Sequence, residues 1–308
     1  MIENVAPRLV ALDWGTSSLR AYLLGGDGQI IARAEEPQGI LQVKDGDFAG
    51  VYGRIVGPWL RRNAAMPAIG CGMIGSRQGW REASYAACPA GLDALAAALT
   101  PVETPLGPFR IVPGMNVIDA DGVPDVMRGE ETQILGQFGP GQNGVAVLPG
   151  THSKWVLVED GRIGRFATFM TGEAFAAMKD HTILGRLMTG TASDASAFAR
   201  GVDHGAKPPD GRGGLLHRLF STRTLGLFDQ VKGEALSSYL SGLMIGSEIA
   251  EAVAWLGRAP DRVSVIGGAA LSDLYVAALA RRSIMSAPGT PDAAAQGLLR
   301  IARAAKLV

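Results

Sequence analysis

The stretch that most constrains this chain runs from Arg8 to Leu24, where two apolar segments flank a short polar bend. Leu9 to Leu12 is typical of a buried strand, and a turn signal, Gly25-Gly26-Asp27-Gly28, follows the second apolar segment. The pattern therefore predicts a β-hairpin. Its bend carries one carboxylate, one glycine and several hydroxyls, among them Asp13, Gly15, Thr16 and Ser17.

The residue types at this bend are those that a nucleotide site needs. Gly15 has no Cβ, so its backbone can approach a ligand closely, and the N–H groups and hydroxyls of Thr16 and Ser17 can surround an anion. Asp13 would repel that anion unless a cation lay between them, and Mg²⁺ is usually held by one or two carboxylates together with phosphate oxygens. The bend predicts a magnesium–nucleotide site, although an ordinary polar turn explains this stretch alone equally well.

A second copy of the pattern favours the nucleotide site. Residues 145–158 again place an apolar strand before Gly-Thr and small polar residues, and Asp160-Gly161 supplies the turn. Leu148 stands in register with Asp13, so this copy lacks the carboxylate. We expect its bend to donate hydrogen bonds to phosphate through Gly150, Thr151, His152, Ser153 and Lys154, although the Lys154 side chain could equally point away along its strand.

A glycine-rich loop follows a short predicted strand at residues 67–72 and contains the densest group of polar and aromatic residues. Loops after strands commonly bind ligands in α/β proteins. Arginine offers a planar donor for a carboxylate, and aromatic rings offer flat walls for a sugar-like chain. The loop predicts a substrate site at Arg77, Gln78 and Trp80, with Tyr85 as a second wall; a surface loop with solvated charges is the alternative.

Two adjacent carboxylates, Glu130 and Glu131, lie in a segment predicted to be helical up to Phe138, with Asp125 as its candidate N-cap. Carboxylates in a first turn favour the helix dipole, which would explain both. The functional alternative is that one of them is a general base. Adjacent helix positions differ by about 100° around the axis, so both cannot face the same cleft.

Three later segments complete the expected organisation. Gly267 and Gly268 separate a strand from a helix, a turn that aims backbone N–H groups at an anion and leaves room for a flat ring, so we expect them to line the nucleotide. The longest helical pattern spans residues 233–255, where Gly242 and Gly246 permit close approach of another element. Residues 193–214 are rich in glycine and proline and predict a long loop.

The length and the net charge of the chain limit the number of domains and the classes of partner that we expect. A chain of 308 residues exceeds the usual size of one hydrophobic core, so two domains are expected. A formal net charge of zero lacks the footprint of a nucleic-acid-binding protein. No long apolar stretch or signal peptide is apparent, which predicts a cytoplasmic protein without a membrane partner. Cys71 and Cys88 are too few for a disulfide framework or a zinc site and are expected to be buried thiols.

Several of these strings resemble known motifs. The bends at Asp13–Ser17 and Gly150–Ser153 and the segment Gly267–Ser272 resemble the two phosphate motifs and the adenosine motif of the superfamily that joins sugar kinases, actin and the heat-shock chaperone ATPases. Three longer strings resemble the 2-dehydro-3-deoxygalactonokinase family more narrowly. They are Cys71-Gly-Met-Ile-Gly-Ser-Arg-Gln-Gly-Trp80, Met127-Arg-Gly-Glu-Glu-Thr-Gln133 and Leu148-Pro-Gly-Thr-His-Ser-Lys-Trp155.

This resemblance implies an α/β fold with two ribonuclease H-like domains, each a mixed five-stranded sheet with flanking helices, and a nucleotide cleft between the domains. The first lobe would span residues 1–138 and bind the sugar acid, and the C-terminal helix, within residues 291–308, would pack back on it. The second lobe would span residues 139–290 and bind the nucleotide.

The resemblance also implies an activity, the ATP- and Mg²⁺-dependent phosphorylation of the 6-hydroxyl of 2-dehydro-3-deoxy-D-galactonate in sugar-acid catabolism. Asp13 would hold the metal, and Glu130 would take the proton of the sugar hydroxyl, with Asp13 as the fallback base. Related carbohydrate kinases place a Gly-Asp pair where this chain has Gly129-Glu130, so the choice among Glu130, Glu131 and Asp13 stays open.

Other functions stay open from the sequence. A kinase for another sugar or keto-deoxy acid, a polyphosphate phosphatase of the same superfamily, and a polymer-forming nucleotide switch all share the general motifs. The aromatic and arginine-rich loop favours a small acidic substrate over the phosphatase and the switch. The preferred epimer and the oligomeric state, including a homo-oligomer, are left undecided by the sequence.

Overall fold

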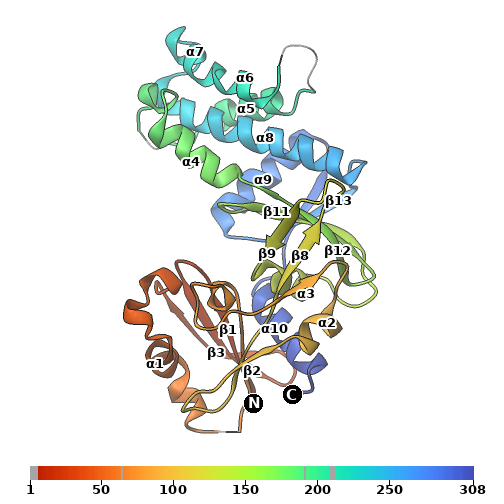
Figure 1. Cartoon of the computed structure of the whole chain (residues 1–308). Helices are drawn as coiled ribbons and strands as arrows, with labels where there is room; N and C mark the ends of the chain where they lie inside the picture. The colour runs from red at the N-terminus through yellow and green to blue at the C-terminus, as the bar shows by residue number, and fades with distance from the viewer. Residues whose placement is uncertain (1–5, 64, 191, 209–212) are drawn as a thin grey trace, which may run out of the picture. The chain divides into compact units, whose positions relative to one another are not determined.

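The computed structural model describes residues 6–63, 65–190, 192–208 and 213–308 (Figure 1). The chain divides into two compact units. The first comprises Met1–Asn143, Val158–Phe166 and Thr290–Val308, and the second comprises Gly144–Leu157 and Ala167–Gly289.

The first unit is built on a mixed six-stranded sheet in the order β3-β2-β1-β4-β7-β6. Strand β1 pairs antiparallel with β2 and parallel with β4, so the predicted first hairpin is confirmed. The expected five strands become six because short β6 pairs antiparallel with β7 at the sheet edge. The bounds are β1 Pro7–Trp14, β2 Leu19–Gly25, β3 Ile30–Glu36, β4 Ala68–Cys71, β6 Thr100–Val102 and β7 Phe109–Ile111.

A second, three-stranded sheet in this unit has the order β5-β8-β9. Its strands are β5 Tyr85–Ala87, β8 Gly114–Ile118 and β9 Pro124–Met127. The helices of the unit are α1 Phe48–Leu60, α2 Leu92–Ala97, α3 Glu130–Gln137 and α10 Ala293–Ala304. Asp125 lies in β9, so its prediction as a helix N-cap was wrong, and Gly129 is the N-cap of α3.

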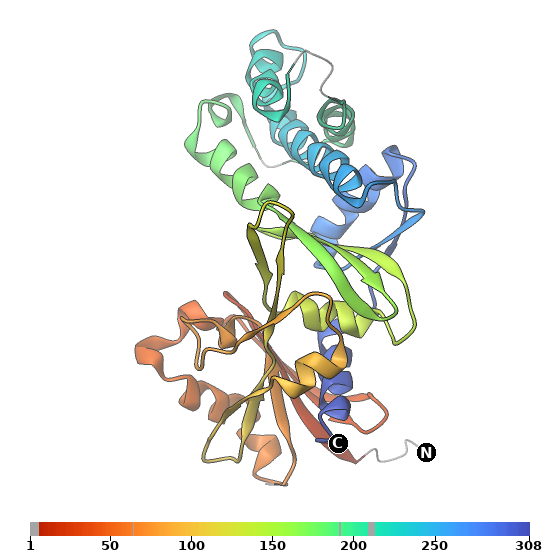
Figure 2. The ribbon, with the colours of Figure 1, turned by 45° about the vertical axis from the view of Figure 1, so that its right-hand side comes forward.

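Helices α3 and α10 pack in close backbone contact, although they lie far apart in the sequence. A Cβ at Gly136 of α3 would collide with the Ala293 carbonyl, and a Cβ at Gly297 of α10 would collide with the Thr132 carbonyl. Figure 2 shows the blue C-terminal helix beside the red strands of the first sheet. The glycines thus let α10 brace both α3 and β1, which carry two of the candidate site residues.

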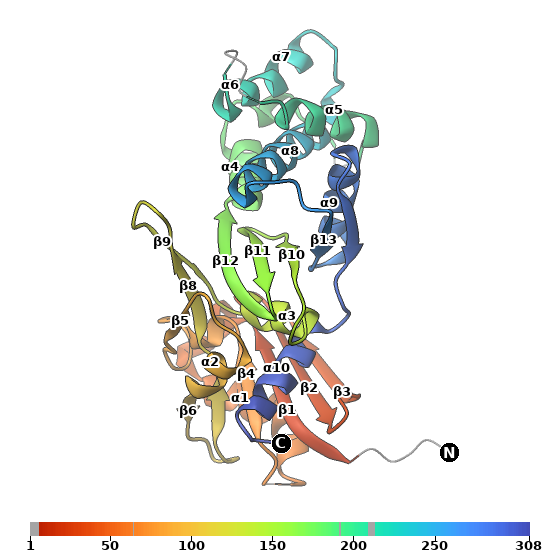
Figure 3. The ribbon, with the colours of Figure 1, turned by 90° about the vertical axis from the view of Figure 1, so that its right-hand side faces the viewer.

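A five-stranded sheet has the order β12-β11-β10-β13-β14, and Figure 3 labels four of these strands. The second unit contains β10, β13 and β14, most of β11 and the end of β12, while Val158–Phe166 belongs to the first unit. Short connections join β10 to β11 and β11 to β12, as the repeated hairpin pattern predicted. The bounds are β10 Gly144–Leu148, β11 Ser153–Glu159, β12 Arg162–Phe169, β13 Arg262–Val265 and β14 Met285–Pro288.

Among the described residues, six α-helices accompany this sheet: α4 Thr171–His181, α5 Ala195–Gly205, α6 Leu215–Leu219, α7 Ser221–Leu227, α8 Leu236–Leu256 and α9 Ala269–Arg281. The prediction of a loop over residues 193–214 was wrong where α5 forms, because Asp194 caps that helix and its apolar face packs on α8; residues 209–212 lie outside the described part. Gly242 and Gly246 do allow the predicted close approach, since a Cβ at either would collide with the α5 backbone. None of the described helices has the length and apolarity to cross a membrane.

Candidate active site

Asp13 lies where β1 ends, opposite Arg20 on β2 and Cys71 on β4. Its side chain is half-buried, and among the described residues the one hydrogen bond to its carboxylate comes from the Cys71 thiol at 4.0 Å. Burial raises the pKa of Asp13 to about 6; the charge of Arg20 opposes this rise and that of Glu130 adds to it. A carboxylate with so few donors around it is a fitting ligand for a cation, which would lower its pKa again.

Three backbone segments converge beside this carboxylate. Gly72, which follows β4, and Gly129, which precedes α3, both have positive φ values, of 92° and 109°. A Cβ at Gly72 would lie 2.8 Å from the Trp14 carbonyl oxygen, and one at Gly129 would lie 3.0 Å from the Gly72 Cα atom. Only glycine tolerates both the conformation and the contact, so these positions bring the start of α3 to the ends of β1 and β4.

The two adjacent glutamates have different surroundings. Glu131 is fully buried, and its carboxylate accepts hydrogen bonds from the Gly129 N–H at 2.6 Å and the Thr132 hydroxyl at 2.8 Å. Burial raises the pKa of Glu131 to about 8, and the charge of Glu130 adds to the rise. Glu130 is half-buried and accepts a hydrogen bond from the Arg128 N–H at 3.0 Å. Of the two, Glu130 is therefore the one that a substrate could reach.

The bend after Asp13 presents exposed backbone. Gly15 donates its N–H to the Ser18 carbonyl at 2.9 Å, and a Cβ at Gly15 would meet only that carbonyl, at 3.6 Å. The next two residues, Thr16 and Ser17, are exposed. Neither the backbone conformation nor the packing of the described residues requires glycine at position 15.

The second bend has the same open backbone and more support from side chains. A Cβ at Gly150 would come no closer than 3.7 Å to another residue. Glu173, in the first turn of α4, donates its N–H to the Thr151 carbonyl at 2.9 Å and pairs with His152 at 2.5 Å. The bend is thereby tied to the N-terminus of α4.

The next two residues of the second bend point into the protein. Ser153 is fully buried, with its hydroxyl 2.8 Å from the Tyr275 hydroxyl, and the buried Lys154 donates to the Thr168 hydroxyl at 2.7 Å. The Lys154 side chain thus reaches the neighbouring strand β12. Neither side chain is presented to a ligand at the bend.

A buried carboxylate holds this second bend in place. Glu248 of α8 accepts hydrogen bonds from the Trp155 indole at 2.8 Å and from the Tyr275 hydroxyl at 2.6 Å. Ser153, Tyr275 and Glu248 thus form one buried hydrogen-bond network. Burial raises the pKa of Glu248, and hydrogen bonds from Thr171, Tyr275, Trp155 and Ser153 oppose that rise.

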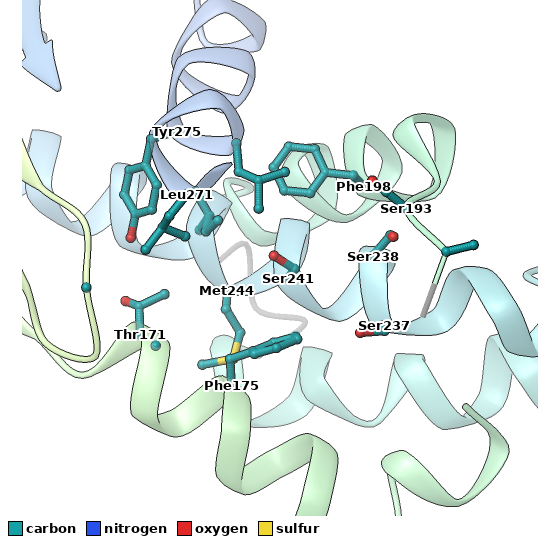
Figure 4. A pocket seen from close by; sticks show the side chains of 15 residues that line it. Thr171, Phe175, Ser193, Phe198, Ser237, Ser238, Ser241, Met244, Leu271 and Tyr275 are labelled. Atoms are coloured by element: carbon teal, nitrogen blue, oxygen red, sulfur yellow. The ribbon is translucent and has the colours of Figure 1, made fainter. Parts of the chain in front are cut away.

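Beside this network the second unit has a cavity of about 270 Å³ (Figure 4). Gly150 of the bend, Thr171 and Phe175 of α4, and Leu271 and Tyr275 of α9 contribute to its lining. Further residues come from α8 and nearby segments, namely Ser237, Ser238, Ser241, Met244 and Ile245 of α8 with Gly172, Ala192, Ser193, Phe198 and Leu274. The mainly apolar wall with a few hydroxyls is typical of a small-molecule pocket.

Gly267 and Gly268 lie between β13 and α9, with Gly268 as the N-cap. Both are exposed, and a Cβ at Gly268 would meet nothing within 4 Å. They precede Leu271 and Leu274, which line the cavity from the first turns of α9.

The predicted substrate loop has a rigid interior and an exposed outer edge. The Trp80 ring packs with its centroid 5.7 Å from that of Phe109 and 5.5 Å from that of Tyr52. Arg77 is highly exposed and pairs with Glu82 at 3.0 Å, and Gln78 is exposed as well. Trp80 therefore anchors the loop in the core of the first unit, while Arg77 and Gln78 face outward.

Of the site residues expected from the sequence, Asp13, Glu130 and the loop lie in the first unit, and Gly150 to Lys154 with Gly267 and Gly268 lie in the second. Sequence reasoning also missed several residues of the site. It assigned no role to Arg128, Tyr275, Glu248 or the cavity serines. The signal available for Glu248 was its place, with Glu251, among the two carboxylates of a mostly apolar helix.

Comparison with known proteins identifies the family of this chain. The family model described as 2-keto-3-deoxy-galactonokinase matches residues 13–301. A Rhizobium meliloti (strain 1021) protein named as a 2-dehydro-3-deoxygalactonokinase is 37% identical over 299 residues, 96% of each chain. The Escherichia coli (strain K12) protein of that name is 32% identical over 268 residues, 87% of this chain and 88% of its own.

Among solved structures, a Sinorhizobium meliloti protein described as a 2-dehydro-3-deoxygalactonokinase superimposes with a TM-score of 0.86 at 36% identity. The match covers 96% of this chain and 98% of that one. The chain thus belongs to the 2-keto-3-deoxy-galactonokinase family.

Proposed function

We propose that this protein is an ATP-dependent kinase that transfers the γ-phosphoryl group to the 6-hydroxyl of 2-dehydro-3-deoxy-D-galactonate. The family match over residues 13–301 supports the reaction and the substrate. The observation that carries the proposal is Asp13, a half-buried carboxylate with one weak donor, next to exposed backbone at Gly15. Phosphoryl transfer requires positioning and charge neutralisation more than covalent chemistry by the protein.

The first unit would bind the sugar acid and carry out the proton transfer. Asp13 would hold Mg²⁺, whose charge neutralises the phosphate oxygens when it is bound. Glu130 would accept the proton of the sugar hydroxyl, with Asp13 as the fallback base. Arg77, Gln78 and Trp80 belong to the loop that would contact the rest of the sugar acid.

The second unit would bind the nucleotide. The open backbone of Gly150 and the N–H groups of Thr151 and His152 would donate to phosphate oxygens, and Gly15 to Ser17 would do the same from the first unit. Ser153 and Lys154 would act through the backbone, because their side chains are engaged elsewhere. Gly267 and Gly268 would line the ribose of the nucleotide, and the cavity that Leu271 lines would bind the adenine base.

On this proposal the two units are ribonuclease H-like lobes that hold one nucleotide between them, residues 1–138 with the C-terminal helix serving the sugar acid and residues 139–290 serving ATP. Closure of the lobes would exclude water, which competes with the sugar hydroxyl as phosphoryl acceptor. We place the activity in the cytoplasm, where ATP is available.

A coupled assay of ADP formation tests the proposal. It would compare 2-keto-3-deoxy acids of different configuration, plain hexoses and no acceptor, each with ATP and Mg²⁺. We expect the highest kcat/KM for 2-dehydro-3-deoxygalactonate, with phosphate recovered on the sugar acid. Equal phosphate release without an acceptor, or hydrolysis of polyphosphate, would instead identify a phosphatase.

A further inference from the structure

Arg128 is a buried cation with unused donors. It lies between β9 and α3 and is 9% exposed. One guanidinium nitrogen, Nη2, donates to the Ala83 carbonyl at 2.8 Å, and the guanidinium carbon lies 4.3 Å from the centroid of the Tyr85 ring. The other two nitrogens, Nε and Nη1, are enclosed and have no hydrogen-bond partner among the described residues.

The other buried arginine of the described chain shows what a purely structural arginine looks like here. Arg218 is 7% exposed, and its Nη atoms donate to the backbone carbonyls of Gly205, Lys207 and Pro208. Backbone oxygens therefore compensate for the burial of Arg218. Arg128 has one such carbonyl and a ring face, which leaves most of its donors unsatisfied.

A second polar group without a partner belongs to Ser76, the residue after a glycine that contacts Arg128. The Ser76 hydroxyl is also buried without a hydrogen bond. Its neighbour Gly75 is in tight contact with Arg128, since a Cβ there would lie 3.0 Å from Nη1. The Ala83 N–H in turn donates to the Gly75 carbonyl at 2.9 Å. Unsatisfied donors are rare in folded proteins, and a buried charge without a partner is the most costly case.

We propose that Arg128 and Ser76 bind the carboxylate of the sugar acid, and that Arg128 is the residue that selects an acidic substrate. This inference rests on the proposed kinase function. A carboxylate would supply the acceptor oxygens that Nε and Nη1 lack, in the charge-assisted geometry for which arginine is suited. The Tyr85 ring and the Ala83 carbonyl fix the plane of the guanidinium before the acid arrives.

The position of Arg128 also fits the length of the substrate. Gly72 packs beside Asp13, whereas Gly75 packs beside Arg128, and the short helical turn Met73–Gly75 joins them. At about 2 Å of rise per residue, three residues span roughly 6 Å. An extended six-carbon acid has a similar length, so a carboxylate at Arg128 would leave the 6-hydroxyl near Asp13 and Glu130.

The enclosure of Nε and Nη1 adds one requirement. These atoms are enclosed in the structure, so the acid can reach them only if part of the surrounding protein moves. The segment from Gly75 to Ala83 contacts Arg128 at both of its ends. This segment is held by the Trp80 ring and by a few backbone hydrogen bonds, including that of Ala83 to Gly75. Binding of the acid and rearrangement of the loop are therefore coupled.

The test compares 2-dehydro-3-deoxygalactonate with its primary amide, which keeps the chain and removes the charge. For the wild-type enzyme we expect kcat/KM to favour the acid by at least about 100-fold. Arg128→Met should bring this ratio near one, mostly through the KM for the acid, and Ser76→Ala should reduce it several-fold. Arg218→Met removes a buried arginine elsewhere and should leave the ratio unchanged.

The outcomes separate the proposal from its rivals. If Arg128→Met lowers both substrates equally, Arg128 is structural and the proposal is wrong. If Arg77→Met, and not Arg128→Met, removes the preference, the exposed arginine of the loop is the anchor. Should Arg128→Met fail to fold, the Ser76→Ala ratio decides. Should no phosphoryl transfer occur with any acceptor, the kinase function fails, and calorimetric binding of acid and amide still tests Arg128.

Discussion

The two bends of this chain share a layout but not their side-chain chemistry. Each follows a buried strand, presents a glycine whose Cβ would meet little of the protein, and leads into a strand that ends at an Asp-Gly turn. The first bend carries Asp13, a carboxylate with almost no protein donors. The second has the buried Leu148 at that position, and its side chains are held by Glu173, Thr168 and Tyr275.

This difference suits the two bends to different tasks in binding and catalysis. A carboxylate that the protein leaves unsatisfied is suited to a cation and to chemistry, because its charge is available to a ligand. A bend fixed by hydrogen bonds on several sides is suited to holding phosphate in one position without reorganisation. On the proposed function, the same backbone pattern would serve reactivity in the first unit and binding in the second.

The largest effect should come from the carboxylate of the first bend. Asp13→Asn removes the charge that holds the metal, and we expect kcat to fall by at least about a thousandfold, since the loss of several kcal/mol of charge stabilisation acts in the transition state. The thermal unfolding temperature should change little. Asp27→Asn, in the turn of the same hairpin, is the control, and near-normal turnover of Asp13→Asn would remove the metal role.

The next effect concerns the base. Glu130→Gln keeps the shape of the side chain and removes its proton acceptor, so kcat should fall by about a hundredfold or more. Glu131→Gln should keep kcat within a few-fold of wild type, because its carboxylate is buried and hydrogen-bonded to Gly129 and Thr132. Steady-state kinetics of the pair decide the assignment, and the reverse order of effects would make Glu131 the base.

The glycines of the two bends should have a smaller and more selective effect. Gly15→Ala and Gly150→Ala each place a methyl group where phosphate is expected, and we predict that the KM for ATP rises about tenfold while the fold is retained. Gly53→Ala is the control, because a Cβ on this residue of α1 meets nothing within 4 Å and at Gly15 and Gly150 it would make only ordinary van der Waals contacts. An unchanged KM in one bend variant would show that its bend does not touch the nucleotide.

The smallest effect is on stability. The folded state keeps Glu131 protonated up to about pH 8, whereas the unfolded chain releases that proton above about pH 4.5. Folding therefore takes up a proton between these values, and the free energy of unfolding falls as the pH rises through them, by up to about 1.4 kcal/mol per pH unit from this group.

Glu131→Gln should flatten this dependence. Urea unfolding at pH 5, 6.5 and 8 measures it, and the quantity that matters is the difference in slope between wild type and variant, since Asp13 also has a raised pKa. Identical slopes would mean that Glu131 is ionised in the folded protein at neutral pH.

Local patterns in the sequence predicted the hairpins, the helix α8, and the places of Asp13, Gly15 and Gly150 at the bends, because each depends on neighbours within one element or one turn. The N-cap of α3 was missed because Gly129 acts through its backbone and through contact with Gly72. Helix α5 was missed because glycine and proline at its flanks obscured its apolar face.

The remaining site residues depend on contacts between distant segments. Arg128 is identified by what surrounds it, namely Ala83, Tyr85 and Gly75. Ser153 and Tyr275 meet only because β11 and α9 fold together. Neither periodicity nor motif spacing shows whether a hydrogen-bond donor has a partner. The structure was therefore needed to orient Lys154 and Ser153 and to find the unsatisfied donors of Arg128.

The most direct test of whether both bends hold one triphosphate is a crystal structure with Mg²⁺ and a non-hydrolysable ATP analogue. We predict phosphate oxygens within hydrogen-bond distance of backbone N–H groups at Gly15–Ser17 and at Gly150–His152, with Mg²⁺ bound to Asp13 directly or through water. A triphosphate held by one bend alone, with the other bend facing solvent, would contradict the account.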